Sequence, residues 1–235
     1  MIEVKQLHKT FGKLTVLDEL DLSIKSGGIF AVLGPNGSGK TTLIKCILGM
    51  VIPQKGDIIF DGESVIRQSE YRNKINYMPQ IANFPANLTV IELIEMVKNL
   101  RPKEANETHL ISLFGLEPHL EKKLGNLSGG TKQKVNIVLA FMFDSELIIL
   151  DEPTTGLDPI ALISLKELIQ GAKEQGKTIL VTTHIMSLVD EIADEIVFLL
   201  DGKIYFKGSV PALKEQTGEP HLEHAIANLL RKQNV

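Results

Sequence analysis

Short runs of apolar residues recur along the chain, and longer segments of mixed polarity separate them. Strands that are covered on both faces read as near-continuous apolar runs, because neither side of the strand meets water. The pattern therefore predicts a parallel sheet buried between helices. The four clearest runs are Ile29–Leu33, Leu147–Leu150, Ile179–Thr182 and Ile196–Leu200.

A second kind of β segment lies near the N-terminus. Ile2–Leu7, Val16–Ile24 and Asp57–Asp61 have β character and lie around a Gly27-Gly28 turn. We expect these segments to form an antiparallel flap beside the main sheet. Asp201-Gly202 interrupts the stretch 196–206 with a dipeptide typical of tight turns, which predicts a β-hairpin there.

The stretch from residue 81 to residue 135 is long, polar and helical in period. It predicts a helical insertion into an α/β core made of residues 1–80 and 136–210. Residues 211–235 are charged and short, and we expect one or two helices in this tail. The positions of the insertion that are expected to face inward are Leu88, Ile91, Ile94, Leu110 and Leu113.

Composition fits a globular protein with a substantial core. The 235 residues are 43% hydrophobic and 23% charged. A net charge of −4 gives no general attraction for nucleic acid, so no nucleic-acid partner is expected. The chain shows neither a secretory signal nor an apolar run long enough to span a membrane. The single cysteine, Cys46, cannot form an internal disulfide and is expected to be a small buried side chain.

A glycine-rich loop carries the first candidate chemistry. It lies between the run Ile29–Leu33 and a helical pattern over Thr42–Leu48. Glycines let successive backbone N–H groups face a phosphate, and the helix start adds positive partial charge. We expect Lys40 to reach the β- and γ-phosphates and the Thr41 hydroxyl to ligate Mg²⁺. The residues expected to bind nucleotide are Gly34, Pro35, Asn36, Gly37, Ser38, Gly39, Lys40, Thr41 and Thr42.

Two adjacent carboxylates follow the run that ends at Leu150. Asp151 is expected to hold the metal through water, and Glu152 to face the γ-phosphate. A carboxylate there can orient the attacking water and accept its proton, so Glu152 is the predicted general base. His184 ends another strand, where a neutral imidazole can donate a hydrogen bond to the transferring oxygens. Lys40, Glu152 and His184 are the predicted catalytic residues.

The segment Leu127–Thr131 reads Leu-Ser-Gly-Gly-Thr and precedes the paired carboxylates. Ser128 is a favourable N-cap, but a cap alone does not explain the two glycines after it. Ser-Gly-Gly at the start of a helix provides a second phosphate cradle. One chain with two cradles raises the question of which nucleotide the second cradle binds.

In order and spacing, these motifs resemble those of the ATP-binding cassette (ABC) ATPases, and the resemblance covers nearly the whole chain. It implies a P-loop NTPase (RecA-like) core with a parallel sheet, an antiparallel β subdomain and an inserted helical subdomain. It also implies a dimer that binds and hydrolyses two ATP molecules with Mg²⁺. In such a dimer, Ser128, Gly129 and Gly130 bind the ATP that the other subunit holds.

The resemblance assigns roles to further residues. Phe11 stands where the family commonly has Tyr and is expected to stack on adenine, with Val16 as an apolar contact. Gln80 is expected to ligate Mg²⁺ and to contact the nucleotide, and Asp158 to act across the dimer. Thr131 is a departure, because Gln is commoner at this position; its hydroxyl is expected to point toward the partner's loop.

The resemblance also implies partners. Because no membrane-spanning run is present, separate membrane-spanning permease subunits are expected, with this chain on the cytoplasmic face of the cell membrane. The second cassette is expected to be a copy of this chain. Ala82–Val97 is the expected wall of the docking groove, although its apolar residues could equally form the insertion's own core. The layout is similar to the ABC-2 group, and Leu127–Asn136 is similar to ATPases of nitrous-oxide-reductase maturation and copper supply.

Two other classes of protein share some of these motifs. A soluble, non-transport ABC ATPase, such as an iron–sulfur assembly ATPase, is the alternative, since it is also a single cassette. A small-molecule kinase with a phosphate loop is disfavoured, because it would not require Ser128, Gly129 and Gly130.

Overall fold

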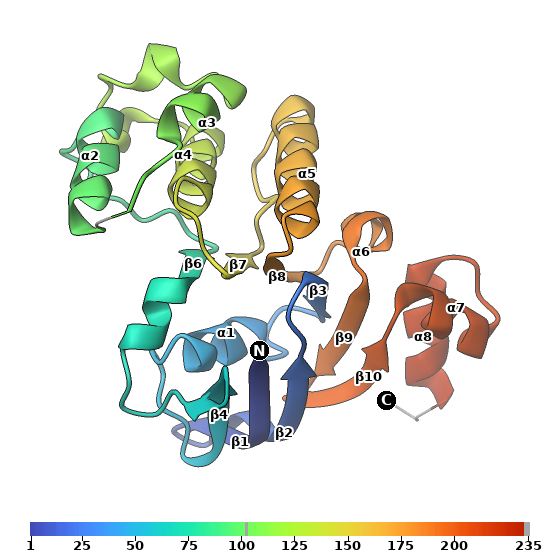
Figure 1. The fold of residues 1–235 in the computed structure, drawn as a ribbon. Coiled ribbons are helices and arrows are strands. Elements are labelled where there is room, and N and C mark those ends of the chain that lie inside the picture. Colours follow the sequence, from blue (N-terminus) through green and yellow to red (C-terminus); the bar gives the residue numbers. More distant parts are fainter. Residues whose placement is uncertain (102, 233–235) are drawn as a thin grey trace. The chain divides into compact units, whose positions relative to one another are not determined.

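The computed structural model describes residues 1–101 and 103–232, which form two compact units (Figure 1). The first unit contains Met1–Arg72 and the segment that begins at Thr178, and the second contains Asn73–Lys177. Eight α-helices and ten strands occur within the described residues. This division differs from the subdomain boundaries expected at residues 80, 135 and 210, and those boundaries stay a prediction.

Antiparallel strands form one sheet of the first unit, in the order β2-β1-β4-β5. The register of β1 with both neighbours shifts near Gln6, which has a left-handed φ of 48° and donates its N–H to Asp21 Oδ1 (2.8 Å). A bulge of this kind bends a strand and increases its twist. The predicted antiparallel flap is confirmed. The strands are β1 (Ile2–Phe11), β2 (Leu14–Ile24), β4 (Lys55–Phe60) and β5 (Glu63–Ser64).

A second group of strands in the first unit is mainly parallel, in the order β10-β9-β3-β8. β3 (Gly28–Leu33) pairs in parallel with β8 (Thr178–Thr183) and with β9 (Glu195–Leu200). β10 (Lys203–Gly208) pairs antiparallel with β9, which confirms the predicted hairpin. β8 is buried throughout, and so is β3 after its first residue, which explains their apolar runs. Two helices follow these strands: α1 (Lys40–Ile47) and α6 (Met186–Ile192).

The expected tail forms two helices, α7 (Val210–Thr217) and α8 (Leu222–Lys232), and its positions 233–235 lie outside the described residues. The Ser209 side chain caps α7 by accepting a hydrogen bond from Ala212 N (3.2 Å). Both helices bury apolar side chains in a cluster shared with β3, β9 and α6, so the tail is part of the core of this unit. Its buried members are Val210, Leu213, Leu222, Ala225, Ile226 and Leu229.

The second unit combines two parallel strands with four helices. β6 (Ile75–Met78) pairs with β7 (Leu147–Asp151). β6 is not evident from the apolar pattern of the sequence, because Asn76 and Tyr77 interrupt this short run. The helices are α2 (Val90–Leu100), α3 (Glu107–Leu113), α4 (Gly129–Phe141) and α5 (Pro159–Glu174). Short 3₁₀ turns cover Glu117–His119 and Leu124–Asn126, and another covers Glu70–Lys74.

A capping box sets the start of α2. Thr89 Oγ1 accepts a hydrogen bond from Glu92 N (3.3 Å), and Glu92 Oε2 accepts one from Thr89 N (2.8 Å). These bonds satisfy N–H groups that a helix start otherwise leaves without partners. With this start, the buried side chains of the helix are Val90, Leu93 and Ile94.

Two of the five expected inward positions, Ile94 and Leu110, are fully buried. Leu88, Ile91 and Leu113 are half-buried, so these three expected inward positions are covered only in part. Leu88 precedes the capped helix, Ile91 lies beside its buried face, and Leu113 ends α3. The phase of a helix depends on where its cap lies, which the apolar pattern alone did not locate.

None of the helices within residues 1–101 and 103–232 combines the length and the apolar character needed to cross a bilayer.

Cys46 on α1 is 1% exposed, and burial raises the pKa of its thiol to about 11. Its expected role as a buried side chain is confirmed.

The core contact of α7 predicts that a truncation in the tail destabilises the protein. Leu213 is fully buried, so Leu213→Ala should lower the free energy of unfolding by about 2–5 kcal/mol through lost burial and a residual cavity. Glu215 on the same helix is exposed, and Glu215→Ala should change it by no more than about 0.5 kcal/mol. Urea unfolding followed by circular dichroism measures both. Equally small effects would contradict a core role for the tail.

Candidate nucleotide site

The phosphate loop joins β3 to α1 within the first unit. Gly37 and Gly39 have φ values of 86° and 107°, a region in which a side chain strains the backbone. Gly39 is the N-cap of α1, and no side chain caps this helix with a hydrogen bond. Residues 35–37 are exposed. A helix start without a side-chain cap is a site at which a phosphate can bind.

Close backbone contacts hold the loop in this shape. A Cβ atom on Gly34 would overlap a backbone carbonyl of β9, and one on Gly39 would lie 2.7 Å from the Val16 carbonyl oxygen. Gly202 N, in the turn between β9 and β10, donates a hydrogen bond to the Ser38 carbonyl (3.2 Å). Packing thus requires two of the loop glycines. Val16 contacts the loop through its backbone, and the apolar contact expected of its side chain stays a prediction.

Lys40 begins α1 and folds back over the phosphate loop. Its Nζ donates hydrogen bonds to the carbonyl oxygens of Gly34 (2.8 Å) and Pro35 (3.2 Å), and the residue is 6% exposed. Thr41 and Thr42 follow in the first turn of α1 and are half-buried. The structure therefore places the ammonium group and two hydroxyl-bearing residues at the loop.

Two further predicted residues of the first unit lie at strand ends. Phe11 ends β1 and is 50% exposed, and Lys9 Nζ lies 4.9 Å from its ring centroid. A ring with this exposure can stack on an aromatic base. His184 directly follows β8 and is exposed, and the next residue, Ile185, donates its N–H to Thr183 Oγ1 (3.0 Å). That bond fixes the turn around His184.

The paired carboxylates lie in the second unit, where β7 ends. Asp151 is the last residue of the strand and is fully buried, and Glu152 is 3% exposed with a left-handed φ of 48°. This conformation is costly for a residue with a side chain, and it turns the chain sharply after Asp151. Burial, together with the negative charge of Asp151, raises the pKa of Tyr77 to about 12. That phenol therefore stays neutral at physiological pH.

The residues expected to hold Mg²⁺ offer oxygen donors, which suit a hard cation. Thr41 provides a hydroxyl, Gln80 an amide carbonyl and Asp151 a carboxylate. Gln80 follows β6 and is exposed. Across the described part of the chain, no group of three or more His, Cys, Asp or Glu side chains forms a metal site. The donor set fits an ion that also takes phosphate oxygens and water as ligands, as Mg²⁺ does when it binds with a nucleotide.

Ser128 caps α4, and Gly129 and Gly130 lie in the first turn of that helix. Ser128 Oγ accepts a hydrogen bond from Thr131 N (3.2 Å), and the two hydroxyl oxygens of these residues are 2.8 Å apart. The Thr131 hydroxyl therefore bonds within its own chain, where the sequence analysis expected it to point toward a partner. No other part of the described chain comes within 4 Å of a Cβ built on Gly129, so the start of α4 is open there.

The loop that leads to Asp158 packs against the start of α4. A Cβ atom on Gly130 would lie 2.6 Å from the Gly156 carbonyl oxygen, so the two backbones are in contact. Asp158 caps α5 by accepting a hydrogen bond from Ala161 N (2.9 Å), and its other oxygen pairs with Lys134 Nζ on α4 (2.7 Å). The hydrogen bond from Lys134 holds the pKa of the Asp158 carboxyl below its usual value. The second cradle and the Asp158 loop are one connected structure.

Three polar side chains of α4 that had no predicted role make contacts to neighbouring loops: Gln133, Lys134 and Asn136. Gln133 Nε2 donates a hydrogen bond to the Pro153 carbonyl (3.1 Å), and Asn136 Nδ2 donates one to the Pro79 carbonyl (2.8 Å). Both amide residues are buried. Asn136 lies between the apolar residues Val135 and Ile137, which was the available signal, because a buried amide requires a hydrogen-bond partner.

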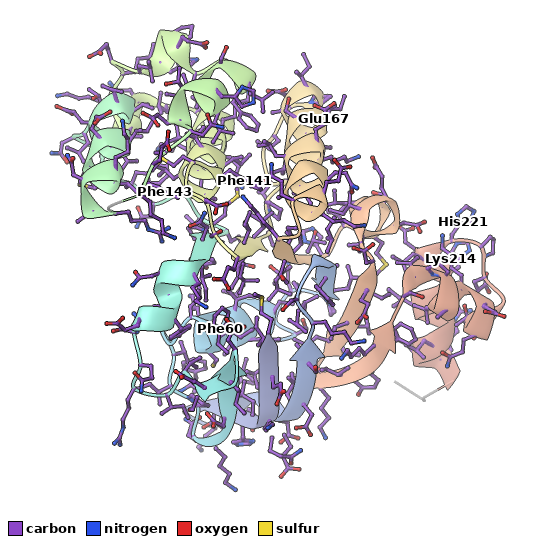
Figure 2. The ribbon with its side chains drawn as sticks, viewed as in Figure 1. Phe60, Phe141, Phe143, Glu167, Lys214 and His221 are labelled. Atoms are coloured by element: carbon purple, nitrogen blue, oxygen red, sulfur yellow. The ribbon has the colours of Figure 1, made fainter. Side chains whose placement is uncertain are left out.

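A cavity of about 740 Å³ also lies in the second unit, among α3, the end of α4 and α5. Figure 2 labels three of its lining residues, Phe141 and Phe143 near the end of α4 and Glu167 on α5. None of the residues predicted for the nucleotide site lines this cavity. The cavity is therefore separate from the predicted nucleotide site.

The contact between Gly130 and Gly156 predicts a difference between two adjacent glycines. Gly130→Ala should lower the free energy of unfolding by about 1–3 kcal/mol, because the added methyl group would overlap the Gly156 carbonyl. Gly129→Ala should be neutral or stabilising by up to about 1 kcal/mol, since its site is open and alanine favours the helix. Urea unfolding of both variants measures the difference. Equal stability of the two variants would contradict the contact.

Comparison with known proteins agrees with this geometry. Residues 17–155 match the protein-family model described as ABC transporter. The chain is 34% identical over 229 residues to the lantibiotic transport ATP-binding protein SrtF of Streptococcus pyogenes, which covers 97% of this chain and 96% of that protein. It is also 34% identical over 209 residues to the bacitracin transport ATP-binding protein BcrA of Bacillus licheniformis, covering 87% and 68% of the two chains.

Solved structures agree as well. The ATP-binding subunit of an ABC transporter superposes with a TM-score of 0.89 at 32% identity, over 97% of this chain and 99% of that one. A dimeric ATP-binding cassette in a post-hydrolysis state, bound to ADP and Pi, superposes with a TM-score of 0.79 at 26% identity, over 89% and 98%. The chain therefore belongs to the ABC transporter family, as an ATP-binding cassette that hydrolyses ATP.

Proposed function

We propose that this chain dimerises around two ATP molecules and drives separate membrane-spanning transporter subunits from the cytoplasmic face of the cell membrane. The observation that carries the proposal is the open start of α4. Ser128 offers a hydroxyl there and Gly129 leaves space, although the same chain already has a phosphate loop at α1. The chain has a phosphate loop of its own at α1. The additional cradle at α4 therefore supports binding of the ATP that another copy of the chain holds.

In this proposal the phosphate loop, Gly34–Thr42, binds ATP within its own chain. Lys40 exchanges its neutral carbonyl acceptors for charged phosphate oxygens, which form stronger hydrogen bonds with an ammonium group. Phe11 stacks on adenine, and Val16 makes an apolar contact beside it. The exposed ring of Phe11 supports this role.

The hydrolytic step is assigned to Glu152 and His184. Glu152 orients the attacking water and accepts its proton, and its buried, conformationally restricted position supports this role, because a general base requires a fixed direction. His184 donates a hydrogen bond to the γ-phosphate. Thr41, Gln80 and Asp151 would hold Mg²⁺, which neutralises phosphate charge during transfer.

Ser128, Gly129, Gly130 and Asp158 are assigned to the ATP of the partner. The γ-phosphate then joins two protein surfaces through charge-assisted hydrogen bonds, and its removal by hydrolysis weakens that contact. The backbone contact between Gly130 and Gly156 and the ion pair between Lys134 and Asp158 join α4 to the Asp158 loop, which supports a concerted response of both elements.

Separate permease subunits are the proposed receivers of this movement. The names of relatives support a transport role, since they include lantibiotic transport, bacitracin transport and the Nod factor export protein of Burkholderia lata. These names lend no support to a copper-processing subtype, and the ABC-2-like layout stays a proposal from the sequence. Ala82–Val97 remains the proposed docking wall. It buries Val90 in its own core, whereas Met96 and the adjacent Ile81 are 43% and 75% exposed and available to a partner.

The base assignment predicts the behaviour of Glu152→Gln. ATP binding should persist while hydrolysis falls by about 10²–10⁴-fold, because the amide cannot accept the proton of water. An ATP-bound dimer should then accumulate. Phosphate release and size-exclusion chromatography with light scattering measure the two effects. Glu146→Gln, at an exposed surface ion pair, is the control and should hydrolyse ATP normally. Ordinary turnover by Glu152→Gln would remove this residue from the base role.

The shared-site assignment predicts the behaviour of Ser128→Arg. The bulky side chain should fill the open start of α4 and block the ATP-dependent dimer, while each monomer still binds ATP through its own phosphate loop. Equilibrium binding of a fluorescent ATP analogue and analytical ultracentrifugation measure the two properties. Ser112→Arg, on the exposed side of α3, is the matched control and should dimerise. If Ser128→Arg hydrolyses ATP normally and at a rate independent of protein concentration, the proposal of a site shared between two copies is contradicted.

A further inference from the structure

The buried amide side chains of α4 point to a positioning role for this helix. We propose that Asn136 positions Gln80, through the carbonyl group of Pro79, for its contact with Mg²⁺ and ATP. This inference rests on the proposed function, because it takes Gln80 as a ligand of that ion.

The hydrogen bond between Asn136 and Pro79 fixes the backbone directly before Gln80. Asn136 is 3% exposed, and its Nδ2 donates to the Pro79 carbonyl oxygen at 2.8 Å. Proline has no N–H group, so its carbonyl is the one backbone group through which a hydrogen bond can hold this residue. That carbonyl belongs to the planar peptide unit that joins Pro79 to Gln80. The bond therefore sets the orientation of the unit from which Gln80 extends.

The same helix holds the neighbouring strand end in the same way. Gln133, which is 4% exposed and lies three residues before Asn136, donates to the carbonyl of Pro153 at 3.1 Å. Pro153 directly follows Glu152, as Pro79 directly precedes Gln80. β6 and β7 are paired in parallel, so α4 contacts the backbone at two adjacent strand ends. A helix whose start forms the second cradle thus holds two segments of the proposed site.

Gln80 depends on this bond more than a core residue would. It is exposed and lies outside any helix or strand, and Ile81 after it is 75% exposed. The backbone bond from Asn83 N to the Ile81 carbonyl (2.9 Å) is local and does not tie the segment to the rest of the unit. Asn136 does so from a buried position. Groups that orient a metal ligand in this manner commonly change metal affinity by about 10–100-fold when they are removed.

The test uses Asn136→Leu, which removes the donor while keeping a side chain of similar shape. The complex of the protein with the slowly hydrolysed analogue ATPγS should bind Mn²⁺, measured by electron paramagnetic resonance, about tenfold more weakly. In the nucleotide-free protein, hydrogen exchange of residues 80–84 should become faster. Gln133→Leu is the matched control on the same helix and should speed exchange at residues 154–157 without affecting residues 80–84. Faster exchange of both segments in both variants would indicate general loosening of α4 and overturn the inference.

A double-mutant cycle with Gln80→Ala separates positioning from stability. Asn136→Leu should weaken Mn²⁺ binding in the parent protein and cause no further loss when Gln80 is already Ala. An equal loss in both backgrounds overturns the inference. If Gln80→Ala weakens binding but Asn136→Leu does not, the inference fails and the proposed ligand role of Gln80 stands. If Gln80→Ala leaves the affinity unchanged, both fail. Asn136→Ala removes the same donor with less bulk and decides the question if Asn136→Leu does not fold.

Discussion

Backbone N–H groups at a helix start can bind a phosphate only where no side chain of the same chain satisfies or covers all of them. α1 meets this constraint with Gly39, whose left-handed backbone supplies no side-chain cap. α4 meets it differently, because Ser128 caps only part of the helix start and Gly129 leaves the rest open. Close backbone contacts hold the starts of both helices in place. The backbones of β9 and of the Gly156 loop both pack where any side chain larger than hydrogen would collide.

The second unit also concentrates its chemistry at the carboxyl ends of two parallel strands, where open α/β sheets commonly bind ligands. β7 ends in the buried Asp151, and the left-handed Glu152 turns the chain immediately afterwards. Prolines adjoin both strand ends, and each presents its carbonyl to an amide of α4. Lys134 on the same helix pairs with Asp158. One helix therefore contacts the segments that follow both strands, at Pro79 and between Pro153 and Asp158, so a ligand that shifts its start would disturb both segments together.

Local patterns explain why much of the fold was predictable. Strands buried on both faces leave an apolar run, which is why β3, β7, β8 and β9 were identified from the sequence. β6 also buries three of its four residues, and the buried Asn76 donates its amide to the Phe143 carbonyl (2.8 Å), a contact between residues far apart in sequence. The pattern therefore showed a polar residue where the structure has a core strand. The exact inward positions of α2 likewise depended on the capping box rather than on apolar spacing.

The sequence by itself determined the phosphate loop, the Ser-Gly-Gly helix start and the paired carboxylates. Each is a contiguous motif whose geometry follows from backbone conformation over a few residues. Only the tertiary structure decided that Thr131 bonds to Ser128, that Gly130 touches Gly156, and that Gln133 and Asn136 hold the two proline carbonyls. The last two contacts join segments separated along the chain. The partners of these amide side chains are backbone carbonyl groups, which every residue possesses. The sequence therefore does not indicate which carbonyl group each amide will contact.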